Sequence, residues 1–292
     1  YVWRLRIITD KFLSWRKSFQ VIALWEFAST LTPGIVGGAA VALFYLTKEK
    51  IALGKSTAIV LLTGFLDEVI FIVTLPILLL ILKQQVFVSA QVCNEASELP
   101  ILNYVDNIAL GTIVIYLILL VFTILIGYGL FVNPRAVKML FVIIARLKFM
   151  KKWKDAIIQS GDDVIYASKE FRSKPTIFWI RAYASTAVSW IARFSLANVL
   201  VIAFGYADVS QLLVYGRQFV IWMMMLIPTT PGGTGIAEIS FIAFMCEFFP
   251  DGTAGTVTFF WRFISYYFFM MLGVLILPRW ISRVYPRKPK DQ

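Results

Sequence analysis

The sequence predicts an all-α fold, a polytopic membrane helix bundle with four full spans and two helical hairpins broken by proline and glycine. Of its 292 residues, 59% are hydrophobic and 15% are charged, whereas soluble domains are about half apolar and about a quarter charged. The mean hydropathy is +0.77. This composition excludes a disordered chain, a collagen-like fibre and an ordinary soluble enzyme, and it predicts an integral membrane protein.

Four stretches are apolar enough to cross a bilayer, whose hydrocarbon core of about 30 Å takes roughly 20 helical residues. They are residues 57–82, 108–132, 176–205 and 254–278. The third of these stretches is the most polar, and it carries serine, asparagine and arginine side chains that fit the wall of a cavity.

Two further apolar stretches, residues 21–46 and 212–249, are interrupted by LTPGIVGG (31–38) and IPTTPGGTG (227–235). A break at membrane depth leaves backbone groups unpaired, and each costs several kcal/mol in lipid. Such breaks survive only where protein or a water-filled cavity supplies hydrogen-bond partners. We therefore expect both stretches to form re-entrant hairpins or discontinuous helices.

The charges that flank the spans predict which ends face the cytoplasm. Residues 1–20, residues 133–174 and the tail from Arg279 have net charges of +4, +6 and +4, and residues 83–107 have −2. Because basic segments stay on the cytoplasmic side, the first three are expected there and residues 83–107 outside. This rule accounts for the total charge of +11, so no nucleic-acid partner is expected.

The basic connector, residues 133–174, contains apolar side chains near helical spacing. Those that fall roughly on one face are Phe149, Trp153, Ile157, Val164 and Ser168. Two interpretations are open: an amphipathic helix at the membrane surface, or a solvated connector that obeys the charge rule. We favour the solvated connector.

The two breaks share the pattern P-x-x-x-G-G. It consists of Pro33, Gly37 and Gly38 in the first break and of Pro228, Gly232 and Gly233 in the second. In each copy a charged residue follows 29 positions after the second glycine, Asp67 in one and Arg262 in the other. The copies are entered from opposite sides, which predicts an inverted repeat of about residues 21–82 and 211–278 in one domain, 1–292. The alternative is chance, because proline and glycine are frequent in membrane helices.

Helices that begin after Gly38 and Gly233 would present backbone N–H groups and a positive dipole end to an anion. We expect this anion to be the phosphate of a lipid headgroup. The alternative is that the glycines only let the hairpin arms pack closely. The full set assigned to the two breaks is Pro33, Gly37, Gly38, Pro228, Pro231, Gly232, Gly233 and Gly235.

Charged side chains at membrane depth are costly and are candidates for function by default. They are Glu26, Asp67, Glu68, Arg193, Arg217, Glu238 and Arg262. All except Arg217 are predicted to line a polar cavity that binds substrate. Since acids and arginines are nearly balanced, the alternative is that they only pair with one another to hold the bundle together.

Composition also limits the chemistry of the chain. It has no histidine, and its two cysteines, Cys93 and Cys246, are not at a metal-ligand spacing. Zinc and haem sites that depend on imidazole, and catalysis by Ser-His or Cys-His, are therefore excluded. We expect no catalytic residues, no metal and no cofactor.

The segment PTTPGGTGIAE (228–238) resembles the transmembrane flippase domain of lysylphosphatidylglycerol synthase/flippase proteins. The family pattern P-x-x-P-G-G-x-G-x-x-E is filled at every position, by Pro228, Pro231, Gly232, Gly233, Gly235 and Glu238. TPGIVGG (32–38) is similar to the family's first motif, and Arg262 suits the basic residue usual after the second. Ala39 and Ala42 depart from an acid and a basic residue found in many relatives, and Asp67–Glu68 replaces a Glu-Arg pair.

The resemblance covers nearly the whole chain and implies a stand-alone flippase-like protein of the bacterial inner membrane, without a synthase domain. It implies translocation of a polar lipid between leaflets, and a phospholipid, an aminoacylated lipid and a polyprenyl-linked sugar are the open alternatives. Membrane lipids are the expected substrate and solvent, and a synthase is a candidate partner. Because residue 1 is tyrosine, we expect the N-terminus to be truncated. The alternatives are an ion-coupled small-solute transporter, a membrane enzyme acting on lipid, and a non-catalytic accessory subunit of an envelope lipid or glycan pathway.

Overall fold

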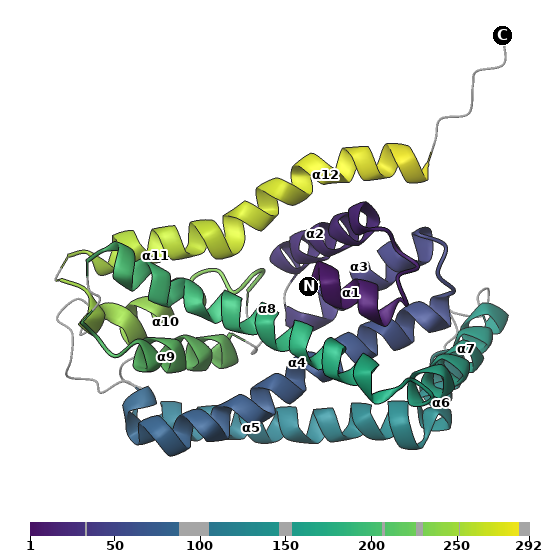
Figure 1. Ribbon diagram of the computed structural model, residues 1–292, viewed down its shortest axis with the longest axis horizontal. Helices are drawn as coiled ribbons and strands as arrows, with labels where there is room; N and C mark the ends of the chain where they lie inside the picture. Colours follow the sequence, from purple (N-terminus) through teal and green to yellow (C-terminus); the bar gives the residue numbers. More distant parts are fainter. Residues whose placement is uncertain are drawn as a thin grey trace, which may run out of the picture.

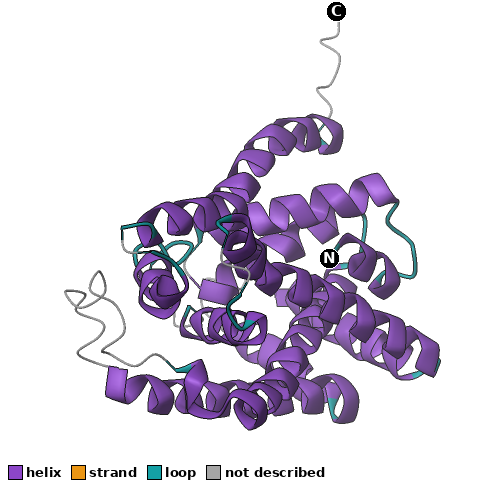
Figure 2. Cartoon of the chain, turned by 60° about the vertical axis from the view of Figure 1, so that its left-hand side comes forward, coloured by secondary structure: helices purple, strands orange, loops and turns teal. Residues whose placement is uncertain are grey.

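The computed structural model describes residues 1–32, 34–87, 105–145, 154–205, 208–225, 230–250 and 252–285. Across these ranges all regular elements are helices and none is a strand (Figure 2). The first half contains α1 (Val2–Ile8), α2 (Trp15–Leu31), α3 (Gly34–Lys48), α4 (Leu53–Leu82), η1 (Lys83–Val86), α5 (Val105–Gly127), the π-helical η3 (Tyr128–Val132) and α6 (Pro134–Ala145). The second half contains α7 (Lys154–Arg172), α8 (Thr176–Ala203), α9 (Gln211–Met224), α10 (Ile236–Met245), η5 (Cys246–Phe248), α11 (Ala254–Arg262), the π-helical η6 (Phe263–Tyr267) and α12 (Phe268–Val284).

The four predicted spans are confirmed as long apolar helices. Within the described ranges, four helical segments are long and apolar enough to cross a membrane: Leu53–Val86, Ala109–Val132, Thr176–Ala203 and Ala254–Val284. The last of them is one continuous helix in which α11, η6 and α12 follow one another. The prediction of an all-α membrane bundle is therefore correct.

Both broken stretches form helix–break–helix hairpins. In the first, α2 ends at Leu31 and α3 begins at Gly34; in the second, α9 ends at Met224 and α10 begins at Ile236. The arms of each hairpin pack against each other. The first break is shorter than predicted, because most of LTPGIVGG (31–38) is already helical. The re-entrant placement of these hairpins stays a prediction.

The two hairpins occupy different halves of the molecule, and α4 passes from one half to the other (Figure 1). One hydrophobic cluster contains Phe219 of α9 and Phe241 of α10, and a second contains Leu24 of α2 and Leu46 of α3. Helix α4 contributes to both clusters, which explains how it joins the halves. Large apolar side chains on the outer faces of α5, α8 and α12 are exposed, as expected for helices in lipid.

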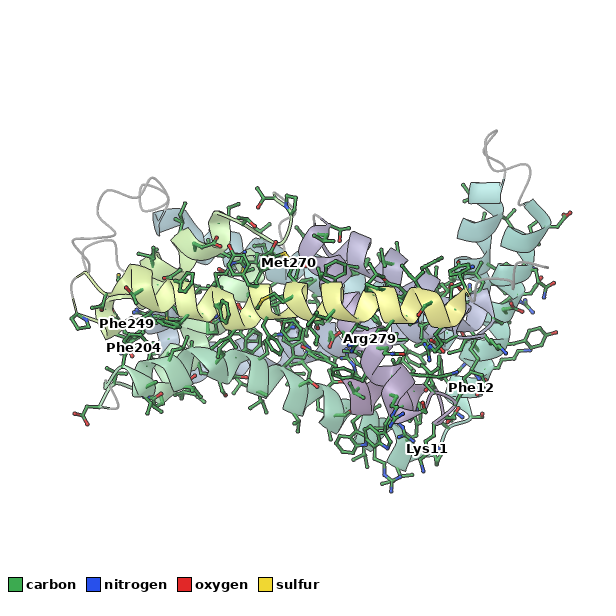
Figure 3. All side chains as sticks on the ribbon, turned by 90° about the horizontal axis from the view of Figure 1, so that it is seen from above. Lys11, Phe12, Phe204, Phe249, Met270 and Arg279 are labelled. Carbon is green, nitrogen blue, oxygen red and sulfur yellow. The ribbon has the colours of Figure 1, made fainter. Side chains whose placement is uncertain are left out.

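The basic segments gather at one end of the molecule. In Figure 3, Lys11 and Phe12 lie at the end that also carries the α6–α7 connector, and Phe204 and Phe249 lie at the opposite end. Helix α12 ends on the side of the connector (Figure 1). This arrangement agrees with the charge pattern, and the cytoplasmic assignment of the basic end stays a prediction.

Part of the predicted apolar face of the connector is covered by protein. Helices α6 and α7 form a hairpin, and α7 also packs against α4. Val164 and Ser168 are fully buried, so this part of the face lies neither in water nor at the membrane surface. Phe149, Trp153 and the side chain of Ile157 lie outside the described part of the chain.

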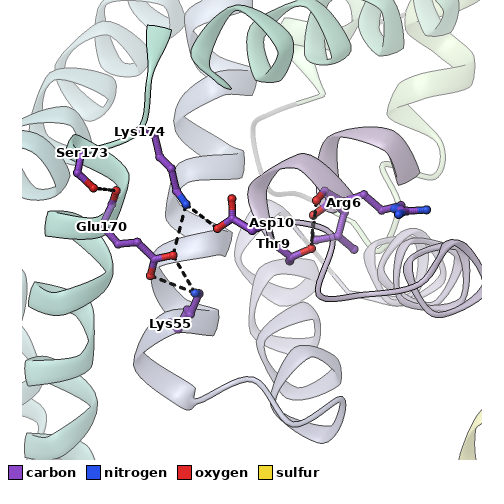
Figure 4. Close-up of polar contacts among 8 residues, drawn as sticks. Arg6, Thr9, Asp10, Lys55, Glu170, Ser173 and Lys174 are labelled. Carbon is purple, nitrogen blue, oxygen red and sulfur yellow. Dashed lines mark hydrogen bonds and ion pairs between the residues drawn. The ribbon is translucent and has the colours of Figure 1, made fainter. Parts of the chain in front are cut away.

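Polar contacts tie the connector to the rest of the basic end (Figure 4). Lys55 at the start of α4 pairs with Glu170 of α7 at 3.0 Å, and Lys174 pairs with Asp10 at 2.7 Å and with Glu170 at 3.6 Å. Partial burial lowers the pKa of Lys174, but the hydrogen bond to Asp10 and the nearby carboxylates outweigh it and raise that pKa. The network joins α4, α7 and the turn after α1.

Replacing Glu170 with glutamine is expected to change the free energy of unfolding by less than about 1 kcal/mol, because its carboxylate is screened by water. Its side chain is 38% exposed. Denaturant unfolding of the purified protein in detergent measures this change. A much larger loss would mean that the network holds the connector in place, in contrast to our expectation.

Candidate functional site

A cavity of about 310 Å³ lies where helices from both halves meet. Its walls come from α1, α2, α3, α4, α5, α8, α9, α11 and η6 and from the break before α10. Five of the six predicted site residues line it: Glu26, Asp67, Glu68, Arg193 and Arg262. The sixth, Glu238, joins the same site through an ion pair with Arg262. The cavity therefore gathers charges from positions far apart in the sequence.

Arg193 of α8 occupies a cage of aromatic rings. Its Nη2 donates to Oε2 of Glu26 on α2 at 2.7 Å. Its guanidinium lies 5.2–5.7 Å from the ring centres of Tyr1, Trp190, Trp222 and Phe269. Aromatic faces attract a guanidinium electrostatically, so ion pair and rings together hold this charge at the cavity.

Asp67 of α4 is engaged from two other helices. It forms an ion pair with Arg4 of α1, and it accepts a hydrogen bond from Nε1 of Trp190 at 2.6 Å. Arg4 is only 4% exposed. Sequence reasoning missed Arg4 because it counted this arginine among the basic residues that flank the first hairpin.

Arg262 and Glu238 form the third ion pair, with Nε and Oε1 2.6 Å apart. The Arg262 guanidinium also donates to the carbonyl of Gly232 at 3.0 Å and lies 4.3 Å from the Tyr266 ring centre. Tyr266 and the cavity-lining Ser265 belong to the π-helical turn η6. Such turns displace side chains from the regular helical register and are frequent at functional sites.

The second break needs its glycines. Gly232, Gly233 and Gly235 have φ of +61°, +68° and +88°, a left-handed conformation that side chains disfavour. The N–H of Gly235 donates to Oε2 of Glu238 at 2.7 Å, and the N–H of Gly233 donates to Thr230 O at 3.0 Å. An anion at this helix start has to compete with the Glu238 carboxylate. Pro231 lies at the break, and Pro228 lies outside the described residues.

The first break is organised differently from the prediction. Helix α3 begins at Gly34, so the predicted helix start after Gly38 is wrong, and Gly37 and Gly38 are helical. A Cβ on Gly38 would lie 2.1 Å from Oγ of Ser29 on α2. Gly38 therefore allows α2 and α3 to approach closely, which is the alternative raised for these glycines. Pro33 lies outside the described residues.

Glu68 is set apart from the other acids of the cavity. It is 8% exposed, and its Oε2 accepts a hydrogen bond from Oγ1 of Thr123 on α5 at 2.7 Å. In the described part of the chain no lysine or arginine forms an ion pair with it. Its carboxylate is thus hydrogen-bonded but not balanced by a cation.

Arg217, which was counted among the charges at membrane depth but not assigned to the substrate site, is not among the residues that line the cavity. It pairs with Glu247 at 2.6 Å and donates to the carbonyls of Phe244 at 2.9 Å and Gln85 at 3.3 Å. These contacts join α9 to the end of α10 and to η1. The residue therefore fastens one end of the bundle rather than lining the site.

Comparison with known proteins adds to this geometry. The sequence model of the lysylphosphatidylglycerol synthase TM region matches residues 1–273. A UPF0104 membrane protein of Archaeoglobus fulgidus is 25% identical over 285 residues, which cover 94% of this chain and 80% of the relative. No solved structure matches the chain.

Proposed function

Because this chain belongs to the family of the lysylphosphatidylglycerol synthase transmembrane region, we propose that it moves a polar lipid headgroup between leaflets through the central cavity. One observation carries the proposal: three arginine–carboxylate pairs surround a single cavity inside a bundle of apolar helices. The activity proposed is transport, with membrane lipids as substrate and solvent, and not catalysis.

Stability alone does not account for these pairs. Replacing a buried ion pair by apolar side chains of similar volume is often neutral or stabilising, because desolvation offsets the attraction between the charges. Charged side chains inside a membrane are therefore retained mainly where they serve a pathway or a binding site. Three pairs around one cavity support a site for a charged group.

A phosphate-bearing headgroup matches this site chemically. Guanidinium groups bind phosphate through paired, charge-assisted hydrogen bonds. Arg193 and Arg262 each donate to a carboxylate, and a phosphate would take the place of that carboxylate. Glu26 and Glu238 would then be free to accept from hydroxyl or amine groups of the headgroup.

The acyl chains would stay in the bilayer while the headgroup crosses. The exposed apolar faces of α5, α8 and α12 provide the surface along which they would lie. We place the protein in the cytoplasmic membrane, the inner membrane of a bacterium, with residues 133–174 and the C-terminus on the cytoplasmic side. A synthase that makes the lipid is the partner that fits this role.

We expect the variants Arg262→Ala and Glu238→Gln to slow headgroup translocation at least about tenfold, since a hydrogen bond to a charged group contributes about 1.5–3 kcal/mol. The measurement uses protein reconstituted in vesicles with fluorescently labelled phosphatidylglycerol or phosphatidylethanolamine. Glu170→Gln is the matched control, because it changes a carboxylate that lies outside the cavity.

Two outcomes would count against the proposal. If both variants are folded and translocate at the wild-type rate, Arg262 and Glu238 do not contact the headgroup. If the wild-type protein moves neither lipid faster than protein-free vesicles do, an accessory role becomes the better explanation.

A further inference from the structure

We propose that Glu68 and Gln218 bind a small monovalent cation, a proton or Na⁺, and that this cation is coupled to the headgroup. The cation site rests on the charge of the cavity and on its unsatisfied polar atoms. The coupling rests on the function proposed above, and the experiments below separate the two.

The first observation is the charge of the cavity and of its ion pairs. Arg4, Arg193 and Arg262 are each matched by one carboxylate, those of Asp67, Glu26 and Glu238. Glu68 is a fourth carboxylate, and it accepts a hydrogen bond from the neutral hydroxyl of Thr123. Counting these side chains alone, without the amino group of the cavity-lining Tyr1, which donates to Ser189 Oγ at 2.9 Å, leaves one negative charge in excess. One monovalent cation balances it, whereas a divalent cation would reverse it.

The second observation is an unsatisfied acceptor in the same cavity. Gln218 of α9 is 1% exposed and lines the cavity, and its Oε1 has no hydrogen-bond partner among the described residues. Ser265 of η6 also lines the cavity, and its Oγ is buried without a partner in that part of the chain. Buried polar atoms are nearly always satisfied in native proteins, so such an atom needs an explanation.

A cation satisfies both the Glu68 carboxylate and the amide oxygen of Gln218, whereas an anion satisfies neither of these two groups. An unbalanced carboxylate and an unpaired amide oxygen are both electron-rich groups that a positive charge satisfies. In transporters built from broken helices, coupling ions such as Na⁺ and H⁺ occupy oxygen-lined sites near the substrate. We therefore infer that the ligand is a coupling ion rather than a second part of the headgroup.

The polar and charged groups that share the cavity with Glu68 come from several helices. Asp67 precedes it on the same helix and is held by Arg4 of α1 and Trp190 of α8. Thr123 belongs to α5 and Gln218 to α9. Of the charged cavity residues, the Arg193–Glu26 pair comes from α8 and α2, and Arg262 from α11. None of these arginines is paired with Glu68.

Headgroup and cation should strengthen each other's binding. A phosphate adds negative charge to a cavity that already has one carboxylate in excess, and a bound cation removes that excess. By thermodynamic linkage each ligand raises the affinity of the other by the same factor, typically about 5–150-fold.

The binding experiment uses the purified full chain in detergent. Thermal unfolding is followed in one arm while NaCl replaces choline chloride at constant pH. In the other arm it is followed from about pH 5.5 to about pH 8 without Na⁺, a range in which a buried glutamate can change its charge. We expect one arm to shift the wild-type melting temperature and the responding arm to identify the ion.

The variants test the named residues. Glu68→Gln should abolish the shift, and it keeps an oxygen that accepts from Thr123. Gln218→Met should weaken the ion's affinity at least about fivefold. Glu170→Gln, outside the cavity, should respond as the wild type does. If Glu68→Gln responds to Na⁺ and to pH as the wild type does, the cation site is overturned.

Vesicle assays test the coupling. Translocation of labelled phosphatidylglycerol should accelerate at least about fivefold when the responding ion is supplied, and Glu68→Gln should lose this dependence. Translocation that ignores both ions in the wild type overturns the coupling. A wild type that binds the ion but moves no lipid supports the cation site and contradicts the function proposed above.

Discussion

Replacing Arg193 with alanine is expected to reduce headgroup translocation at least about hundredfold, the largest effect of any substitution in the cavity. The guanidinium of Arg193 lies among four aromatic rings. Its loss also leaves the Glu26 carboxylate, its partner at 2.7 Å, without a positive charge. Removing one partner of a buried ion pair destabilises a protein by about 3–5 kcal/mol. Because this pair is partly exposed, we expect a loss of stability at the lower end of that range.

Exchanging the charges of Glu26 and Arg193 tests whether Arg193 binds the headgroup or only forms a structural ion pair. The double variant Glu26→Arg/Arg193→Glu keeps both charges but moves the guanidinium from α8 to α2, out of its aromatic cage. We expect it to recover part of the lost stability and none of the lost translocation. If the reversed pair restores both, the two residues only hold the bundle together and do not contact the headgroup.

The control for this series is Arg181→Ala, which removes an exposed arginine from the same helix. Its translocation rate in vesicles and its unfolding in detergent should both match the wild type. Folded protein is verified for every variant before rates are compared, so that a lost rate is not mistaken for a lost fold.

The spans were predictable because hydropathy and length decide them. The presence of the two breaks was predictable as well, since proline and glycine clustered in an apolar run often interrupt a helix, although the single prolines Pro76 and Pro278 lie inside α4 and α12. The exact residues at which each helix ends and the next begins were not predictable, because a glycine inside a helix and a glycine at its start look the same in the sequence. Gly38 lies inside α3 against Ser29, whereas Gly232 has a positive φ, and only the packing of neighbouring helices distinguishes the two cases.

The six predicted charges of the cavity were brought together, but their partners could not be deduced from spacing. Arg4 was overlooked because the charge rule treats every basic residue of a flank alike, whereas α1 packs against α8 and buries this one. Asp67 and Glu68 also looked equivalent. Successive residues of a helix point about 100° apart, so Asp67 meets α1 and α8 while Glu68 meets α5.

The contact between α2 and α12 provides the second large effect. A Cβ on Gly273 of α12 would lie 2.2–2.4 Å from the Cγ, Cβ and Cδ2 atoms of Phe27 on α2. Gly273→Leu should therefore push the two helices apart and destabilise the protein by at least about 2 kcal/mol, within the range for overpacked cores. Denaturant unfolding in detergent measures the loss. Gly255→Leu, on the same continuous helix where a Cβ meets nothing within 4 Å, should be nearly neutral.

Removing the obstructing ring should reverse this effect. Phe27→Ala opens the space that the introduced leucine side chain would need, so the double variant Phe27→Ala/Gly273→Leu is expected to be more stable than Gly273→Leu alone. The contact between α2 and α12 matters for the cavity because η6, which directly precedes α12, also contacts α2. The Tyr266 hydroxyl of η6 donates to Thr30 O of α2 at 3.1 Å. Both of these residues line the cavity. If Gly273→Leu is as stable as the wild type, α2 and α12 do not meet there, and the first hairpin does not close this side of the cavity.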